Sequence, residues 1–411
     1  MATRMFDLRI DHHTLTLPLD WARPHGATID VYAAVVSREG GHDLPYLLYL
    51  QGGPGHEAPR PFASPLAPAW LEPALAEYRV VLLDQRGTGK STPVTDDLLT
   101  GGADGAIERL QLLRADAIVR DAEAFREHLG AERWSTLGQS FGGFTSLAYL
   151  SAYPASLERV FLTGGIPGIG RDPVEIYAAT YAKVREASLR YYRRFPAHRA
   201  AVGRLADLAA SGRLELPDGE VVSVSRLRSL GMLLGSDNGW QTLWSLLDQD
   251  PGTNAFRHDL AAALPFTGRN PLYYVLHESC YADGAVTNWA AERAEPEDFR
   301  DDPTLLTGEH VRREWAETVP ALRPWREVAL GLAEVPWPRL YDPDAIAESE
   351  VGGAAAVYVN DLYVPFEFSM VTAGLMPHVE VWATSAYEHS GLRTGAVLGK
   401  LLDLGRGRVI R

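Results

Sequence analysis

Short apolar runs recur along the chain, each followed by a glycine-rich turn or by residues at helical spacing. They span residues 46–50, 79–83, 134–137, 159–163, 355–359 and 379–383. Runs of this length that alternate with helical segments are typical of strands in a mostly parallel sheet covered by helices. Polar and apolar positions alternate over residues 1–20. This alternation predicts one more strand, because a signal peptide would need a basic stretch and a continuous apolar run instead.

Apolar residues at helical spacing also predict the helix that joins two of these strands. Ile118, Ala122, Phe125 and Leu129 recur at intervals of three or four residues, and a glycine follows at once as a stop signal. We therefore expect an amphipathic crossover helix over residues 115–129.

The character of the chain changes between residues 170 and 340. Long stretches rich in Arg, Ala, Leu, Glu and Trp predict helices there, and apolar runs typical of strands become scarce. We expect an α/β core in two parts, residues 1–168 and 341–411, with a helical cap domain inserted at residues 169–340.

Composition narrows the range of partners. Hydrophobic residues make up 46% of the chain and charged residues 22%, which is ordinary for a globular protein with a substantial core. The net charge of −14 disfavours binding to nucleic acid and to anionic membranes, and no apolar stretch approaches the roughly 18 residues of a membrane span. Cys280 is the only cysteine, so no intrachain disulfide can form, and a reducing cytoplasm fits best.

The segment around Ser140 carries the first chemical signal. Gly138, Ser140 and Gly142 form a Gly-x-Ser-x-Gly pattern between the apolar run 134–137 and a helical run at residues 144–153. A serine on a very sharp strand-to-helix turn needs glycine on both sides to avoid clashes, and its hydroxyl then projects at a helix N-terminus. This context predicts an α/β-hydrolase fold with Ser140 as the nucleophile.

A serine hydroxyl is a poor nucleophile at neutral pH, so it requires a base. In this fold the order along the chain is serine, acid and histidine, which leaves His378 and His389 as candidates. His389 follows the predicted strand 379–383, whereas His378 precedes it. Because catalytic loops lie at the carboxyl ends of parallel strands, we expect His389 to be the general base.

The same rule selects the carboxylate that orients the histidine. Asp361 comes two residues after the predicted strand 355–359 and is the preferred acid. Glu367, farther along the chain, is the alternative.

Acyl transfer also needs hydrogen-bond donors for the oxyanion of the tetrahedral intermediate. The glycine-rich loop at residues 51–55 follows an apolar run and can bring a backbone N–H close to a substrate carbonyl. We expect the N–H groups of Gly53 and of Phe141, the residue after the nucleophile, to form this oxyanion hole.

Spacing excludes two other kinds of site. Residues 87–91 read Gly-Thr-Gly-Lys-Ser, but the phosphate-binding loop that they suggest needs glycine at the position of Asp84, so no nucleotide site is expected. The chain has no His-Glu-x-x-His and no paired cysteines, so we expect neither a metal nor another cofactor.

Several segments together resemble the prolyl aminopeptidases (proline iminopeptidases), which are serine peptidases of the α/β-hydrolase fold. The matching segments are residues 51–55, 84–89, 138–143, 360–364 and 388–393. The Asp-Gln-Arg-Gly-x-Gly segment at residues 84–89 is the most family-specific of them, and we expect it to support the loops around the active site. Gln51 departs from the family's usual His-Gly-Gly-Pro-Gly and, with the chain length, is more similar to the longer branch of the family.

The resemblance implies release of N-terminal proline from small peptides with a free N-terminus, and acidic cap residues that hold the α-amino group. Residues 277–281 resemble the family's cap segment with such a glutamate. Glu278 is therefore the candidate amine anchor, and Cys280 and Tyr281 are candidates for the proline pocket. Asp248 is the candidate for a second cap carboxylate that holds the amine. An esterase or amide hydrolase with the same triad, or a di- or tripeptidyl aminopeptidase, is the alternative function.

Overall fold

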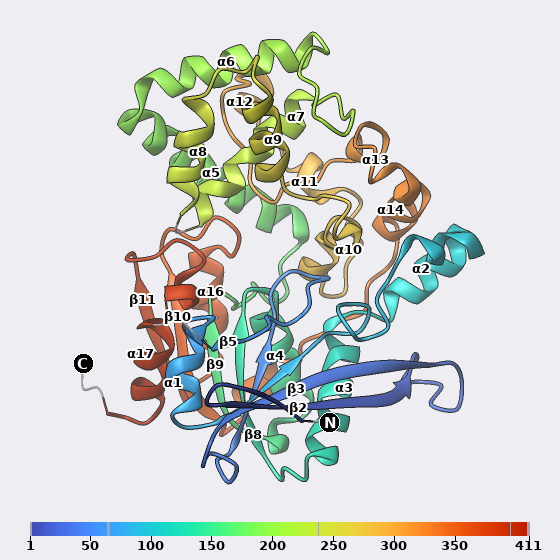
Figure 1. Ribbon diagram of the computed structural model, residues 1–411, viewed down its shortest axis with the longest axis vertical. Coiled ribbons are helices and arrows are strands. Elements are labelled where there is room, and N and C mark those ends of the chain that lie inside the picture. The colour runs from blue at the N-terminus through green and yellow to red at the C-terminus, as the bar shows by residue number, and fades with distance from the viewer. Residues whose placement is uncertain (1, 64–65, 237, 395, 409–411) are drawn as a thin grey trace.

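The computed structural model describes residues 2–63, 66–236, 238–394 and 396–408, in which nine strands form one sheet (Figure 1). In spatial order they are β1 (Ala2–Met5), β2 (Leu8–Pro18), β3 (Thr28–Arg38), β7 (Arg79–Leu83), β4 (Tyr46–Leu50), β8 (Trp134–Gln139), β9 (Leu157–Thr163), β10 (Gly352–Tyr358) and β11 (Val379–Thr384). From β7 to β11 the neighbours are parallel, whereas β1, β2 and β3 pair antiparallel. The six predicted runs are all strands, and the prediction of a mostly parallel sheet is confirmed.

The N-terminal segment differs from its prediction in one respect. Residues 1–20 contain two strands, β1 and β2, because the chain reverses at Phe6, whose φ is +53°. The strand β3 is an element that the sequence analysis did not identify. A separate two-stranded sheet is formed by β5 (Phe62–Ala63) and β6 (Leu66–Ala67).

Helices cover both faces of the sheet (Figure 1). On one face lie α3 (Ala115–His128) and α4 (Phe141–Ala152), and α15 (Pro343–Ala347) packs on α4. On the other face lie α1 (Leu71–Leu75) and α17 (Ala396–Gly405). The predicted crossover helix is α3, and its apolar residues Ile118, Ala122 and Phe125 are buried against the sheet.

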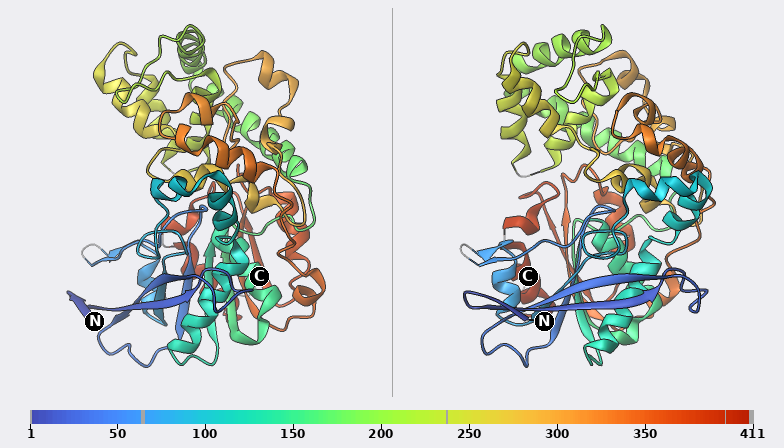
Figure 2. Two further views of the ribbon diagram at one scale, coloured as in Figure 1. Left: turned by 90° about the vertical axis from the view of Figure 1, so that its right-hand side faces the viewer. Right: turned by 45° about the vertical axis from the view of Figure 1, so that its right-hand side comes forward.

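A helical region lies above the carboxyl ends of the parallel strands (Figures 1 and 2). It comprises α5 (Pro173–Arg194), α6 (Pro196–Ala210), α7 (Val224–Arg228), α8 (Gly239–Leu247), α9 (Asn254–Ala263), α10 (Pro271–Val275), α11 (Ala290–Arg293), α12 (Glu297–Asp301), α13 (Trp315–Thr318) and α14 (Arg326–Ala333). We call it the cap. The α16 helix (Phe366–Ala373) lies on the core side, after β10. Among the described helices, none combines the length and the apolar character that crossing a membrane takes.

The hydrophobic cluster of the cap is completed by residues from the core segment. Helix α2 (Ala103–Gln111) packs against α14, and its buried Ala106 and Leu110 belong to the same cluster as Trp315 and Trp325 (Figure 1). The sequence analysis did not anticipate this contact, because α2 lies far from the cap in the chain.

A buried ion pair joins the loop after β7 to helix α3. Arg86 is fully buried, and its guanidinium donates two hydrogen bonds to Asp121, at 2.5 and 2.7 Å. Its remaining N–H groups reach the carbonyl oxygens of Leu19 (2.8 Å) and Leu112 (2.9 Å). A buried charge with this many partners is satisfied, but removing one partner leaves the other charge uncompensated.

We therefore expect Arg86→Met to lower the free energy of unfolding by about 3–5 kcal/mol, because Asp121 would stay buried without its cation. The matched control is Arg133→Met, which removes an arginine that pairs with Glu158 at the surface. Its cost should be below about 1 kcal/mol. Urea-induced unfolding of the purified variants measures both values, and equal losses would contradict the assigned role of the buried pair.

Candidate active site

Ser140 lies at the sharp turn between β8 and α4, with φ 56° and ψ −125°. The turn is possible because glycines surround it. A Cβ at Gly142 would overlap the carbonyl oxygen of Leu50, one at Gly138 would overlap that of Gly142, and one at Gly165 would overlap that of Ser140. Both glycines of the Gly-x-Ser-x-Gly pattern are thus required by close backbone contacts, as the sequence analysis expected.

His389 and Asp361 follow β11 and β10, respectively, and meet beside this turn. The Nδ1–H of His389 donates to Oδ2 of Asp361 at 2.7 Å. The other carboxylate oxygen accepts from the backbone N–H groups of Tyr363 (2.8 Å) and Val364 (3.0 Å). Burial by itself lowers the pKa of His389, but the Asp361 carboxylate, with a smaller contribution from Glu309, outweighs it and raises the pKa above its ordinary value.

The alternative residues lie elsewhere. His378 is exposed and precedes β11, so it sits at the opposite end of the strand from His389. Glu367 has 62% of its side chain exposed and pairs with Lys183 at 3.0 Å. The structure therefore brings Asp361 and His389 together and does not bring His378 or Glu367 to them.

The predicted oxyanion residues lie near Ser140. Gly53 has a φ of +132°, which favours glycine, and it lines the same cavity as Ser140. A Cβ added at the neighbouring Gly52 would come within 3.0 Å of the Cβ of Ser140, so this loop touches the turn. Phe141 is the first residue of α4, where a backbone N–H has no partner within the helix.

The segment at residues 84–89 contacts this loop, as the sequence analysis expected. Gln85 Nε2 donates to the carbonyl oxygen of Gln51 at 2.8 Å. Asp84 is fully buried, and its carboxylate binds the guanidinium of Arg60 (2.5 Å) and the backbone N–H of Lys90 (2.9 Å). Gln85 thus ties this segment to the glycine-rich loop, whereas Asp84 ties it to Arg60 and Lys90.

A cavity of about 380 Å³ connects Ser140 and His389 with the cap. Glu309 is the one acidic side chain among the described residues that line it. Burial raises the pKa of Glu309 to about 7, and the hydroxyl of Tyr273 donates a hydrogen bond to its carboxylate. Nε2 of His277 lies 3.8 Å from Oε2 of Glu309. Burial lowers the pKa of His277 to about 3, so its ring carries no positive charge beside Glu309 at neutral pH.

The described lining of this cavity includes none of the predicted cap residues. The carboxylate of Glu278 accepts from two backbone N–H groups at the start of α11, at 3.1 and 2.9 Å, and burial raises its pKa to about 7. Cys280 is buried, which raises the pKa of its thiol. The hydroxyl of Tyr281 donates to the carbonyl oxygen of Tyr363 at 3.2 Å. Asp248 is exposed at the end of α8 and does not line the cavity.

Tyr177, a buried residue of α5, packs its ring against that of Tyr281. Its hydroxyl is buried and has no hydrogen-bond partner among the described residues. Burial raises its pKa well above the ordinary value, and the charges of Glu278 and Glu309 both add to this shift. The sequence analysis missed Glu309, because it belongs to no motif and only the folded cap brings it into the cavity with Ser140.

Comparisons with known proteins give relatives over nearly the whole chain. The alpha/beta hydrolase fold family matches residues 45–211, a segment that contains Ser140. The proline iminopeptidase of Aeromonas sobria is 40% identical to this chain and the alignment covers 97% of both proteins. The proline iminopeptidase aneH of Aspergillus aculeatus is 30% identical, over 96% of this chain and 93% of the relative.

The close backbone contact at the turn can be tested with one methyl group. Gly142→Ala should destabilise the protein by about 3 kcal/mol, because the Leu50 carbonyl that its Cβ would meet is backbone and cannot move aside. Gly399→Ala is the control: it lies in α17 with open space around it and should stabilise by about 0.5–1 kcal/mol. Thermal and urea unfolding compare the two. A Gly142→Ala protein as stable as Gly399→Ala would refute the predicted contact.

Proposed function

The chain belongs to the proline iminopeptidase family of α/β hydrolases, and we propose that it releases N-terminal proline from peptides through an acyl-enzyme on Ser140. The Oγ atom of Ser140 attacks the carbonyl carbon of the proline residue while Nε2 of His389 accepts its proton. The N–H groups of Gly53 and Phe141 stabilise the oxyanion. His389 then protonates the leaving amine, and water releases proline by the same steps. Asp361 keeps the proton on Nδ1, so that Nε2 remains free to act as the base.

One observation supports this function most directly: the same cavity contains Ser140, His389 and a buried carboxylate, Glu309. We assign Glu309 to the α-ammonium group of the substrate, because a desolvated ammonium needs a carboxylate partner. Glu278 directly follows His277, whose ring lies 3.8 Å from Glu309, and we assign it a second negative charge on this side of the cap. Apolar side chains of the cavity wall, such as Met232 and Leu264, suit the proline ring.

The relatives are named as peptidases, so peptides are the substrate class; the requirement for a free N-terminus is part of our proposal. We also propose a cytoplasmic location, since the only cysteine, Cys280, is a buried free thiol.

The triad assignment predicts the effects of three substitutions. Ser140→Ala, His389→Ala and Asp361→Asn should each lower kcat by about four orders of magnitude. The first removes the nucleophile, the second removes the base, and the third removes the carboxylate that keeps the base in its correct tautomer. His378→Ala and Glu367→Gln are the matched controls and should remain active. Steady-state hydrolysis of a proline arylamide by folded, purified variants measures this. Loss of activity in Glu367→Gln but not in Asp361→Asn would show that the wrong acid was chosen.

The amine-anchor assignment predicts a substrate-dependent loss. Glu309→Gln should lower kcat/KM for proline arylamides about ten- to a hundredfold, the value of one charge-assisted contact. An activated ester without an amine should not share this loss. Glu278→Gln should act in the same direction with a smaller effect. Glu175→Gln, which changes an exposed cap carboxylate, is the control. Equal losses on both substrates would indicate a structural role for Glu309, and efficient cleavage of N-acetylated proline substrates would overturn the aminopeptidase assignment.

The pH profile gives an independent test of the same geometry. The pKa of His389 is raised and that of Glu309 is about 7, so kcat/KM should fall as the pH drops through neutrality, because the base and the anchor both become protonated. In Glu309→Gln, the charge that helps to raise the pKa of His389 is gone. The acidic limb of the profile on the amine-free ester should therefore move to lower pH. An unmoved limb would contradict the coupling between Glu309 and His389.

A further inference from the structure

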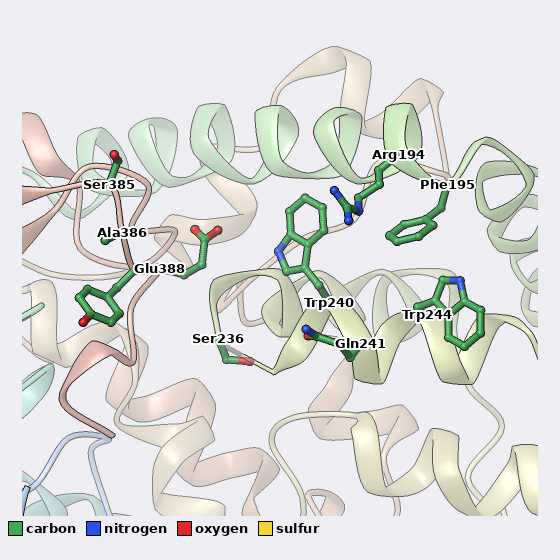
Figure 3. A pocket seen from close by; sticks show the side chains of 10 residues that line it. Arg194, Phe195, Ser236, Trp240, Gln241, Trp244, Ser385, Ala386 and Glu388 are labelled. Carbon is green, nitrogen blue, oxygen red and sulfur yellow. The ribbon is translucent and has the colours of Figure 1, made fainter. Parts of the chain in front are cut away.

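A second and larger cavity, of about 660 Å³, opens next to the catalytic one. Its cap wall carries Phe195, at the end of α5, and Trp240 and Trp244 on α8, and its core wall is the loop of residues 385–388 (Figure 3). This volume lies within the range of small-ligand sites. Nothing in the proposed release of proline uses this cavity.

The two cavities meet at the catalytic base. Ser236 lines both of them, and Glu388 in the second cavity directly precedes His389 in the chain. The backbone N–H of His389 donates to the carbonyl oxygen of Gly235, the residue before Ser236, at 3.0 Å. The leaving amine receives its proton from His389, so the part of the substrate beyond the scissile bond must lie on the side of the base. The second cavity opens on that side.

The walls of this cavity suit a peptide. Trp240 and Trp244 project from one helix, and the guanidinium of Arg194 lies between Trp240 and Phe195 (Figure 3). Trp244 is 43% exposed and lines this cavity, so part of its indole ring is available to a ligand.

Two arginines one turn apart on α5 differ in their partners. Arg190 pairs with Glu388 at 3.2 Å and lies over the ring of Trp240. Arg194 is exposed, and in the described part of the chain no carboxylate forms an ion pair with it. The cavity therefore has an unneutralised cation at its cap end, in a protein whose net charge is −14.

We propose that this cavity binds the peptide chain downstream of the released proline, with the C-terminal carboxylate of a short peptide on Arg194 and apolar side chains on Trp240 and Trp244. The proposal rests on the proposed function, because it concerns the leaving group of the same reaction. Peptide binding in this cavity makes short peptides better substrates than proline derivatives that lack a downstream chain. Among peptides whose length brings the C-terminus to Arg194, free acids are better substrates than C-terminal amides.

The charge is tested with a series of peptides in which proline is followed by one to five alanines, each made as the free acid and as the C-terminal amide. In the wild type, kcat/KM for the acid should exceed that for the amide about three- to fivefold at the length that reaches Arg194. Arg194→Gln should abolish this ratio. Arg193→Gln, a neighbouring exposed arginine that does not line the cavity, should keep it.

The aromatic wall is tested by replacing one alanine of the peptide with leucine. The wild type should prefer the leucine peptide about fivefold, as burial of part of a leucine side chain implies. Trp244→Ala should remove this preference for leucine. Phe6→Ala, which truncates an exposed aromatic residue near the N-terminus that does not line the cavity, should retain it.

Proline amide, whose leaving group is ammonia, separates the two proposals. If the wild type releases proline from neither proline amide nor any peptide, the proposed function fails. A second outcome is that the wild type releases proline, but the acid-to-amide ratio at every length is the same in the wild type and in Arg194→Gln, and Trp244→Ala keeps the leucine preference. In that case this inference is wrong and the proposed function stands.

Discussion

Ser140 can hold a left-handed backbone conformation only where the neighbouring segments bring no side chains against it. Two of these segments follow the strands on either side of β8: the end of β4 with Leu50 and Gly52, and the loop after β9 with Gly165. Their backbones lie so close to the turn that a single methyl group would separate them. The parallel arrangement of β4, β8 and β9 is what brings these backbones together, so the nucleophile depends on strand register as much as on its own motif.

Charge is the second organising element of the site. Glu309 and Glu278 are both buried, and desolvation brings the pKa of each close to neutrality. Burial disfavours the ionised form of such a carboxylate, whereas a nearby cation favours it. A bound cation therefore lowers the pKa of the carboxylate and stabilises its charge. Under the proposed function, binding of an ammonium group is therefore linked to ionisation of Glu309, whose charge also raises the pKa of His389.

The sequence predicted those parts of the molecule whose signal is local. Strands buried on both faces read as continuous apolar runs, and the rule that catalytic loops follow strand ends selected Asp361 and His389 from many candidates. Strand β3 was missed because its first residues alternate in burial while the later ones are buried on both sides, so neither pattern dominates. The cap was predicted as helical, but its side chains were not placed. Glu278 was selected from a segment resemblance, yet its carboxylate is bound to the backbone of α11, whereas Glu309 reaches the cavity.

The hydrogen bond from the His389 backbone to Gly235 ties the loop of the base to the cap. Gly235 has no room for a side chain, since a Cβ there would meet the ring of Tyr363, whose own N–H binds Asp361. The cap therefore supports the position of His389 directly and that of Asp361 through Tyr363. Exchanging the whole cap for that of another hydrolase, as a route to new specificity, would remove this support unless the graft kept a glycine carbonyl at the same point. Specificity is more safely redesigned along α5 and α8, which lie beyond that junction.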